Sequence, residues 1–111
     1  MEGKDIIKLI KVKETPYKRT VYILKRYRDI KNGNIVIDDV PRSIINVMDK
    51  VFDLIKDDEY YPIIELHYMK GFTIEKTANV LSLERTTVYR QKRRLIRRIS
   101  LILYGDEALI K

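Results

Sequence analysis

Residues 73–94 read TIEKTANVLSLERTTVYRQKRR, two helix-length segments separated by the pair Ser82-Leu83. Thr73 is suited to cap the first segment, because its hydroxyl can accept a hydrogen bond from the first helical turn. Two helices joined by so short a turn must cross steeply, and Ala78 provides the small side chain that such a close contact requires. The stretch is therefore predicted to be a helix-turn-helix, a motif that commonly binds DNA.

The second helix of this motif is expected to run from about Glu84 to Tyr104, where Gly105 ends it. A helical wheel at about 100° per residue gives it two opposite faces, one apolar and centred on Val88 and the other rich in arginine. Arginine suits contact with DNA, because its planar fork can chelate a guanine edge or grip a phosphate. The inward residues are expected to be Val88, Leu95, Ile99, Ile102 and Leu103. The expected DNA-binding residues are Thr73, Arg85, Thr86, Thr87, Tyr89, Arg90, Arg93, Arg94 and Arg97.

Leu101 and Tyr104 lie on the wheel opposite the inward stripe. A helix of about 20 residues is about 30 Å long, which is more than one groove contact requires. Its carboxy-terminal half is therefore expected to contact protein. Packing against the amino-terminal helices is the favoured expectation, and a dimer contact is the other, because such proteins often pair two half-sites by two-fold symmetry.

Charge is segregated along the 111-residue chain, whose formal net charge is +7. Basic and acidic residues number ten and four in residues 1–31, three and eight in residues 32–68, and seven and one in residues 84–98. A dense positive face usually meets a polyanion, although a run of charge can also be a solvated helix face. Both interpretations stay open for residues 1–31, whose charges are spread out, whereas the arginines of residues 84–98 favour DNA.

The composition excludes several classes of function. The chain has no cysteine, which rules out disulfides, thiolate zinc sites and cysteine nucleophiles. His67, the one histidine, is expected to be a hydrogen-bonded core or boundary residue rather than a metal ligand. Without a phosphate loop, a nucleophile elbow or metal-ligand spacing, we expect neither an enzyme nor a cofactor. No apolar run approaches a membrane span and residues 1–13 lack a signal-peptide core, so a cytoplasmic protein is expected.

Two further helices are expected in the amino-terminal half. Thr15 and Pro16 can open the first, which runs to about Lys31. The second begins near Asp38 or Asp39 with Pro41 and has the clearest amphipathic pattern in the chain. Candidate core residues are Tyr17, Val21, Tyr22, Leu24 and Ile30 in the first, and Ile44, Ile45, Met48, Val51, Phe52 and Ile55 in the second. Residues 35–37 are expected to be a buried linker, and residues 4–13 either a helix or a frayed arm.

A third helix is expected from about Asp58 to Met69. The cluster Asp57-Asp58-Glu59 is explained by its place at the start of this helix, where acidic side chains favour the positive end of the dipole. Apolar residues cover most of its circumference, which is typical of a helix central to a core; they are Tyr60, Ile63, Ile64, Leu66 and Tyr68. The whole is predicted to be an all-α protein of about five helices, with a helical region at 1–57 and the helix-turn-helix region at 58–111.

Residues 57–105 carry a family resemblance. The runs Tyr60–Met69, Thr73–Leu81 and Arg85–Arg90 resemble the promoter-reading C-terminal domain of bacterial sigma factors. The runs Thr87-Val88-Tyr89-Arg90 and Leu103-Tyr104-Gly105 are similar to those of phage transcriptional regulators of the ArpU and RinA type. Ser82 departs from the pattern, because glycine is usual at that turn. The resemblance implies activation of phage or prophage late genes, with DNA read through Arg85, Thr86, Thr87, Tyr89 and Arg90.

The expected function is sequence-specific binding of double-stranded DNA and regulation of transcription. Residues 1–57 are expected to serve packing, self-association as a homodimer, or contact with RNA polymerase. The alternative is a protein-interaction module that binds RNA polymerase or a sigma factor without reading DNA itself. Binding of RNA or single-stranded DNA is less favoured, because the chain predicts no sheet with exposed aromatic residues.

Overall fold

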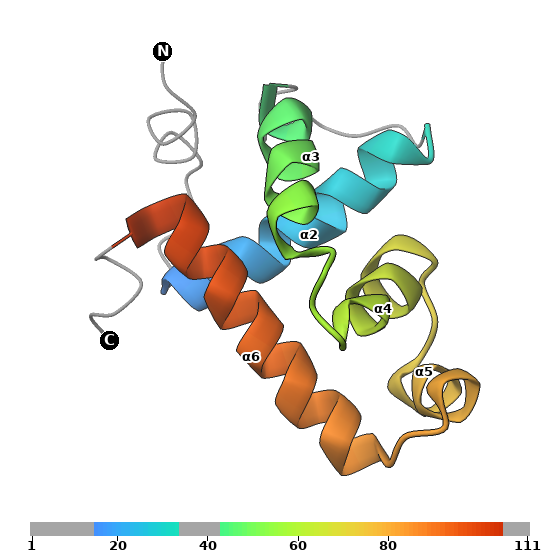
Figure 1. Cartoon of the computed structure of the whole chain (residues 1–111). Helices are drawn as coiled ribbons and strands as arrows, with labels where there is room; N and C mark the ends of the chain where they lie inside the picture. Colours follow the sequence, from blue (N-terminus) through green and yellow to red (C-terminus); the bar gives the residue numbers. More distant parts are fainter. Residues whose placement is uncertain (1–14, 34–42, 106–111) are drawn as a thin grey trace.

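The computed structural model describes residues 15–33 and 43–105 (Figure 1). Within these ranges the chain forms five helices and no strand, which confirms the all-α prediction. The π-helix η1 directly continues α4, and we count the two as one helix. The elements are α2 (Pro16–Lys31), α3 (Ser43–Ile55), α4 (Tyr61–Ile64), η1 (Glu65–Met69), α5 (Ile74–Leu81) and α6 (Arg85–Tyr104). The predictions for residues 4–13, for the linker 35–37 and for the cap at 38–41 lie outside the described residues.

The predicted starts of α2 and α5 are confirmed. The Thr15 hydroxyl accepts a hydrogen bond from the backbone N–H of Lys18 at 3.3 Å, and Pro16 opens the first turn. The Thr73 hydroxyl accepts in the same way from the N–H of Lys76 at 3.0 Å. In both helices a local hydrogen bond satisfies an otherwise unpaired backbone donor, which is why the sequence alone was enough to place these starts.

The third helix begins later than expected, at Tyr61 rather than at Asp58. Asp58 lies in a turn, where its carboxylate accepts the N–H of Tyr60 at 2.9 Å and is also bound by arginines of α6. The Asp58 carboxylate therefore interacts with arginines of α6 rather than with the dipole of α4. Ile63, Ile64 and Tyr68 are buried as predicted, whereas Tyr60 and Leu66 are only half-buried.

Helix α2 is buried on a slightly different face from the one predicted. Only Leu24 of the five candidates is buried, and Thr20, Ile23 and Tyr27 complete the buried set. The other four candidates, Tyr17, Val21, Tyr22 and Ile30, are half-buried. The polar members of the buried set have partners in neighbouring helices: the Tyr27 hydroxyl donates to Asp49 of α3 at 2.6 Å, and its ring packs edge-on against Phe52. In α3 all the predicted core residues are buried except the half-buried Ile45.

Helix α6 contributes to two hydrophobic clusters. The larger cluster joins its carboxy-terminal half to α2, α3, α4 and η1. The smaller one consists of Ile63, Ala78 and Val88 and joins its amino-terminal half to α4 and α5. Because the packing partners change along the helix, the buried stripe turns by roughly 80° from Val88 to Ile96, counted at 100° per residue.

This turn of the stripe corrects two expectations. Ile102, expected inward, is 39% exposed, and Tyr104, placed on the opposite side, is only 2% exposed. Tyr104 belongs to the larger cluster, so packing within the chain is confirmed for this residue. Leu101 is 44% exposed. Ile96 and Ser100 are buried but were absent from the predicted stripe.

The crossing of α2 and α6 contains a buried polar contact. The hydroxyls of Thr20 and Ser100 lie 2.7 Å apart, and each is also 2.8 Å from the carbonyl oxygen four residues before it. Each buried hydroxyl therefore has partners, as buried polar groups require. Both side chains are small, which allows the two helices to approach closely at this point.

Replacing Ile96 by alanine is expected to lower the free energy of unfolding by about 2 to 5 kcal/mol, because the change leaves a cavity in the larger cluster. The matched variant Ile102→Ala removes the same atoms from an exposed position and should cost under about 1 kcal/mol. Urea unfolding followed by circular dichroism measures both values. Equal costs for the two variants would contradict the observed orientation of α6.

Candidate nucleic-acid interface

The turn between α5 and α6 is built on Ser82, which adopts the left-handed conformation with φ 55° and ψ 42°. It is the one residue other than glycine with positive φ in the described ranges. The N–H of Leu83 donates to the carbonyl of Ala78 at 2.9 Å and closes the end of α5. Serine thus takes the conformation that usually calls for glycine, and the tight turn forms as predicted.

The smaller cluster fixes the angle at which α6 leaves this turn. Ala78 is 2% exposed and Val88 is fully buried, with Ile63 of α4 beneath them. Ile74, Leu81 and Leu83 pack around these three residues. A larger side chain at position 78 would push α5 away from α6. The amino-terminal half of α6 is therefore held rigidly against α4 and α5, which is what a binding surface requires.

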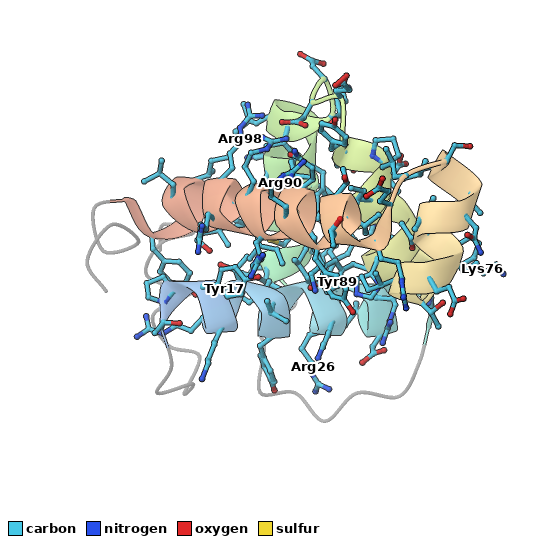
Figure 2. The ribbon with its side chains drawn as sticks, turned by 90° about the horizontal axis from the view of Figure 1, so that it is seen from below. Tyr17, Arg26, Lys76, Tyr89, Arg90 and Arg98 are labelled. Carbon is cyan, nitrogen blue, oxygen red and sulfur yellow. The ribbon has the colours of Figure 1, made fainter. Side chains whose placement is uncertain are left out.

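The predicted DNA-binding residues of α6 lie on its outward side. All are exposed except Thr87, which is half-buried. Arg85, Arg90, Arg93 and Arg97 take part in none of the ion pairs within residues 15–33 and 43–105. Figure 2 shows Tyr89 on the side of α6 that faces α2 and Arg98 on the opposite side. Thr73, the predicted contact outside α6, is exposed at the start of α5.

The amino-terminal end of α6 carries a further positive contribution. Glu84 occupies the N-cap position in an extended conformation, and its side chain makes no capping hydrogen bond. The first backbone N–H groups of a helix point along its axis and carry partial positive charge. The exposed Glu84 carboxylate offsets part of this charge, so an anion such as a phosphate would meet both at this end of α6. This end lies next to Arg85 and Thr86, the first two residues of the helix.

Arg94 differs from the other arginines among the predicted contacts, because its guanidinium group is hydrogen-bonded within the protein. Its two Nη atoms donate to the two carboxylate oxygens of Asp58 at 2.9 and 2.7 Å, and its Nε donates to Gln91 at 2.6 Å. Arg98 adds a contact to Asp58 at 3.3 Å. The side chain of Asp58 is only 10% exposed, and the hydrogen bonds from Arg94 lower its pKa to about 2. Arg94 therefore joins α6 to the turn before α4, and in this conformation it does not present its fork to a base.

Lys92 was not among the predicted contacts, because the wheel placed it near the inward stripe. It is half-buried, with its ammonium 5.5 Å from the centre of the Tyr89 ring. Burial lowers its pKa, and the nearby charges of Arg93 and Lys25 act in the same direction. Lys25 comes from α2, so a second helix contributes positive charge beside α6. The sequence contained a signal for this basic face of α2. Lys18 and Lys25 are seven residues apart, which puts both on one face of the helix.

His67 has the role expected of it. It is half-buried, and its Nδ1 lies 2.7 Å from the carbonyl oxygen of Phe72. Burial lowers the pKa of the ring, the hydrogen bond to the Phe72 carbonyl opposes this in part, and the charges of Lys92, Arg28 and Lys25 lower the pKa further. A neutral ring that donates from Nδ1 to this carbonyl is consistent with the 2.7 Å distance and with the lowered pKa. The bond links η1 to the loop before α5.

Comparisons of the chain with family models, with curated proteins and with solved structures found no significant match. Among the described helices, none combines the length and the apolar character needed to cross a bilayer. The geometry and charge of the helix-turn-helix surface are therefore the grounds for assigning a function.

Replacing Asp58 by asparagine is expected to lower the free energy of unfolding at neutral pH by about 1 to 2 kcal/mol, a value discounted for the solvent around Arg94. The lowered pKa of Asp58 means that its contribution is present above pH 4 and is lost as the pH falls from about 4 to about 2. The difference between wild type and variant should therefore shrink over that window. Chemical unfolding at several pH values measures it.

Asp57→Asn serves as the control for this variant, because it removes the same charge from an exposed neighbour. It should change stability by less than about 0.5 kcal/mol. A loss as large as that of Asp58→Asn would mean that general charge, rather than the Arg94 contact, is responsible.

Proposed function

We propose that this chain binds double-stranded DNA through the amino-terminal half of α6 and regulates transcription. One observation carries the proposal: a rigid helix-turn-helix presents Arg85, Arg90, Arg93 and Arg97 outward, and none of them is in an ion pair within the described residues. Such a concentration of like charge opposes folding unless a polyanion neutralises it. DNA supplies both the charge and a groove of matching shape.

The dimensions of the helix fit this role. The major groove of B-DNA is about 12 Å wide and admits an α-helix. In helix-turn-helix proteins the first turns of the second helix meet the base edges. Here those turns carry Arg85, Thr86, Tyr89 and Arg90, and Arg93 follows one turn after Tyr89. Arginine can chelate a guanine from this position, and threonine and tyrosine hydroxyls can donate to phosphates.

Activation of phage or prophage late genes is the more specific part of the proposal. It is supported by the resemblance of the runs Thr87–Arg90 and Leu103–Gly105 to regulators of the ArpU and RinA type. The basic helix-turn-helix surface is compatible with either activation or repression. Reporter transcription from a promoter that carries the selected site, with and without the protein, distinguishes the two.

Replacing Arg85 or Arg90 by alanine is expected to weaken binding of duplexes selected by the wild-type protein from a random pool. A guanine contact contributes about 1 to 3 kcal/mol, so its loss lowers affinity by about 5-fold to about 150-fold. Fluorescence anisotropy at fixed salt measures the affinity. Lys50→Ala, which removes one exposed positive charge from α3, is the control and should leave affinity within about twofold.

Unchanged affinity in both arginine variants would remove the amino-terminal half of α6 from the binding surface. Circular dichroism verifies that each variant is folded. No loss of fold is expected, because both side chains are exposed and unpaired within the described ranges. A palindromic selected site would further support binding as a homodimer.

A second candidate function is a protein-interaction module for RNA polymerase or a sigma factor. The observation in its favour is the exposure of Leu101 and Ile102 at the carboxy-terminal half of α6, together with Leu54 of α3, which is 61% exposed. Exposed apolar side chains of this size are suited to protein contact. Capture of polymerase that survives replacement of Arg85, Arg90, Arg93 and Arg97 by alanine, in a protein with no affinity for DNA, would favour this candidate.

A further inference from the structure

An open groove of about 590 Å³ lies between α2, η1 and α6. Figure 1 shows α2 passing behind the carboxy-terminal half of α6 and then diverging from the amino-terminal half. Figure 2 shows Tyr17 and Tyr89 in the space between the two helices. Its lining includes Tyr17, Lys18, Tyr22, Lys25, His67 and Lys92.

The lining of this groove is basic and aromatic. It includes three lysines and one histidine, and none of the described lining residues is acidic. Lys25 is exposed and takes part in no ion pair within the described ranges. The charges that act on Lys92 and His67 all come from lysine or arginine side chains. The positive potentials of these side chains add up within the groove, so an anion bound there would be attracted by both walls.

The groove is continuous with the outward arginines of α6. Burial raises the pKa of Tyr17, on its α2 wall, and the positive charges of Arg93 and Arg97 act on this hydroxyl in the opposite direction. Lys92 belongs to the groove and contacts Tyr89 of the proposed DNA surface. A single positive surface thus runs from α6 into the groove and up to Lys25 on α2.

The position of the groove matches the shape of duplex DNA. A helix in the major groove fills most of its width of about 12 Å, so an element packed at the side of that helix faces the phosphate strand at the edge. Packed helices lie about 8 to 10 Å apart, which puts α2 at that distance from α6 near their crossing. The phosphate strand on this side of α6 would therefore lie along the groove, between α6 and the α2 wall.

We propose that the phosphate backbone of one DNA strand enters this groove, and that Lys25 of α2 and Lys92 of α6 bind its phosphates. The inference rests on the proposed function and extends it, because it makes α2 a second DNA-binding element. The tyrosine hydroxyls of the lining supply additional hydrogen-bond donors to the same strand. Contacts of this kind position the protein on the duplex without selecting a sequence.

The test compares Lys25→Gln and Lys92→Gln with the control Lys50→Gln on α3. Each groove variant is expected to weaken binding by about threefold to tenfold near 0.15 M salt, equally for a selected duplex and for a random-sequence duplex of 30 base pairs. The slope of log affinity against log salt should fall in magnitude by about 0.9 for each. Lys50→Gln should change neither the affinity nor the slope.

His67 provides a direct report of occupancy, because it is the one histidine of the chain and lines the groove. Its ring NMR signals are expected to shift when wild-type protein binds the random-sequence duplex. The shift should be reduced in Lys25→Gln and Lys92→Gln at equal DNA saturation.

Three results would overturn the inference. If the salt slope is unchanged in both groove variants while Arg90→Ala still weakens binding, the groove is not a phosphate site and the proposed function stands. If the duplex leaves His67 unchanged but poly-glutamate shifts its signals, the groove binds an acidic protein segment. If the wild-type protein binds no duplex at all, the proposed function fails together with the inference.

Discussion

Helix α6 packs against different partners at its two ends, and this constraint determines which of its side chains face solvent. At the amino-terminal end Val88 is buried against α4 and α5, while from Leu95 onward the helix is buried in the larger cluster. With both ends held, the helix cannot rotate about its axis. The outward direction of Arg90 and its neighbours is therefore a consequence of core packing, and no interaction of the arginines themselves is needed to maintain it.

The basic residues of α6 fall into two groups with different roles. Arg94 and Arg98 bind Asp58 and stabilise the turn that precedes α4. The other outward arginines make no such contact within residues 15–33 and 43–105, and they form the surface that we assign to DNA. Lys92 is different again, because it lies on the wall of the groove shared with α2. A basic run that looks uniform in the sequence is thus divided between contacts within the protein and an outward face that we assign to DNA.

Features determined by neighbours in the sequence were predictable, and features determined by distant contacts were not. The caps at Thr15 and Thr73 and the contact of Ala78 with Val88 depend on residues close in the chain. The burial of Ile96 and Tyr104, the pairing of Asp58 with Arg94 and the groove beside Lys92 depend on where α2 and α4 pack. A helical wheel assumes one buried direction for the whole helix, so it misplaced Ile102 when the partners changed along α6.

The most direct test of the account is an NMR titration of the ¹⁵N-labelled chain with a duplex selected by the protein itself. Amide signals of residues 85–93 are expected to change most, with smaller changes along the groove face of α2. Signals of the exposed residues Asn46 and Lys50 on α3 should stay unchanged. Changes confined to α3, or to Leu101 and Ile102, with none between Arg85 and Arg93, would contradict the assignment of α6 as the DNA-binding surface.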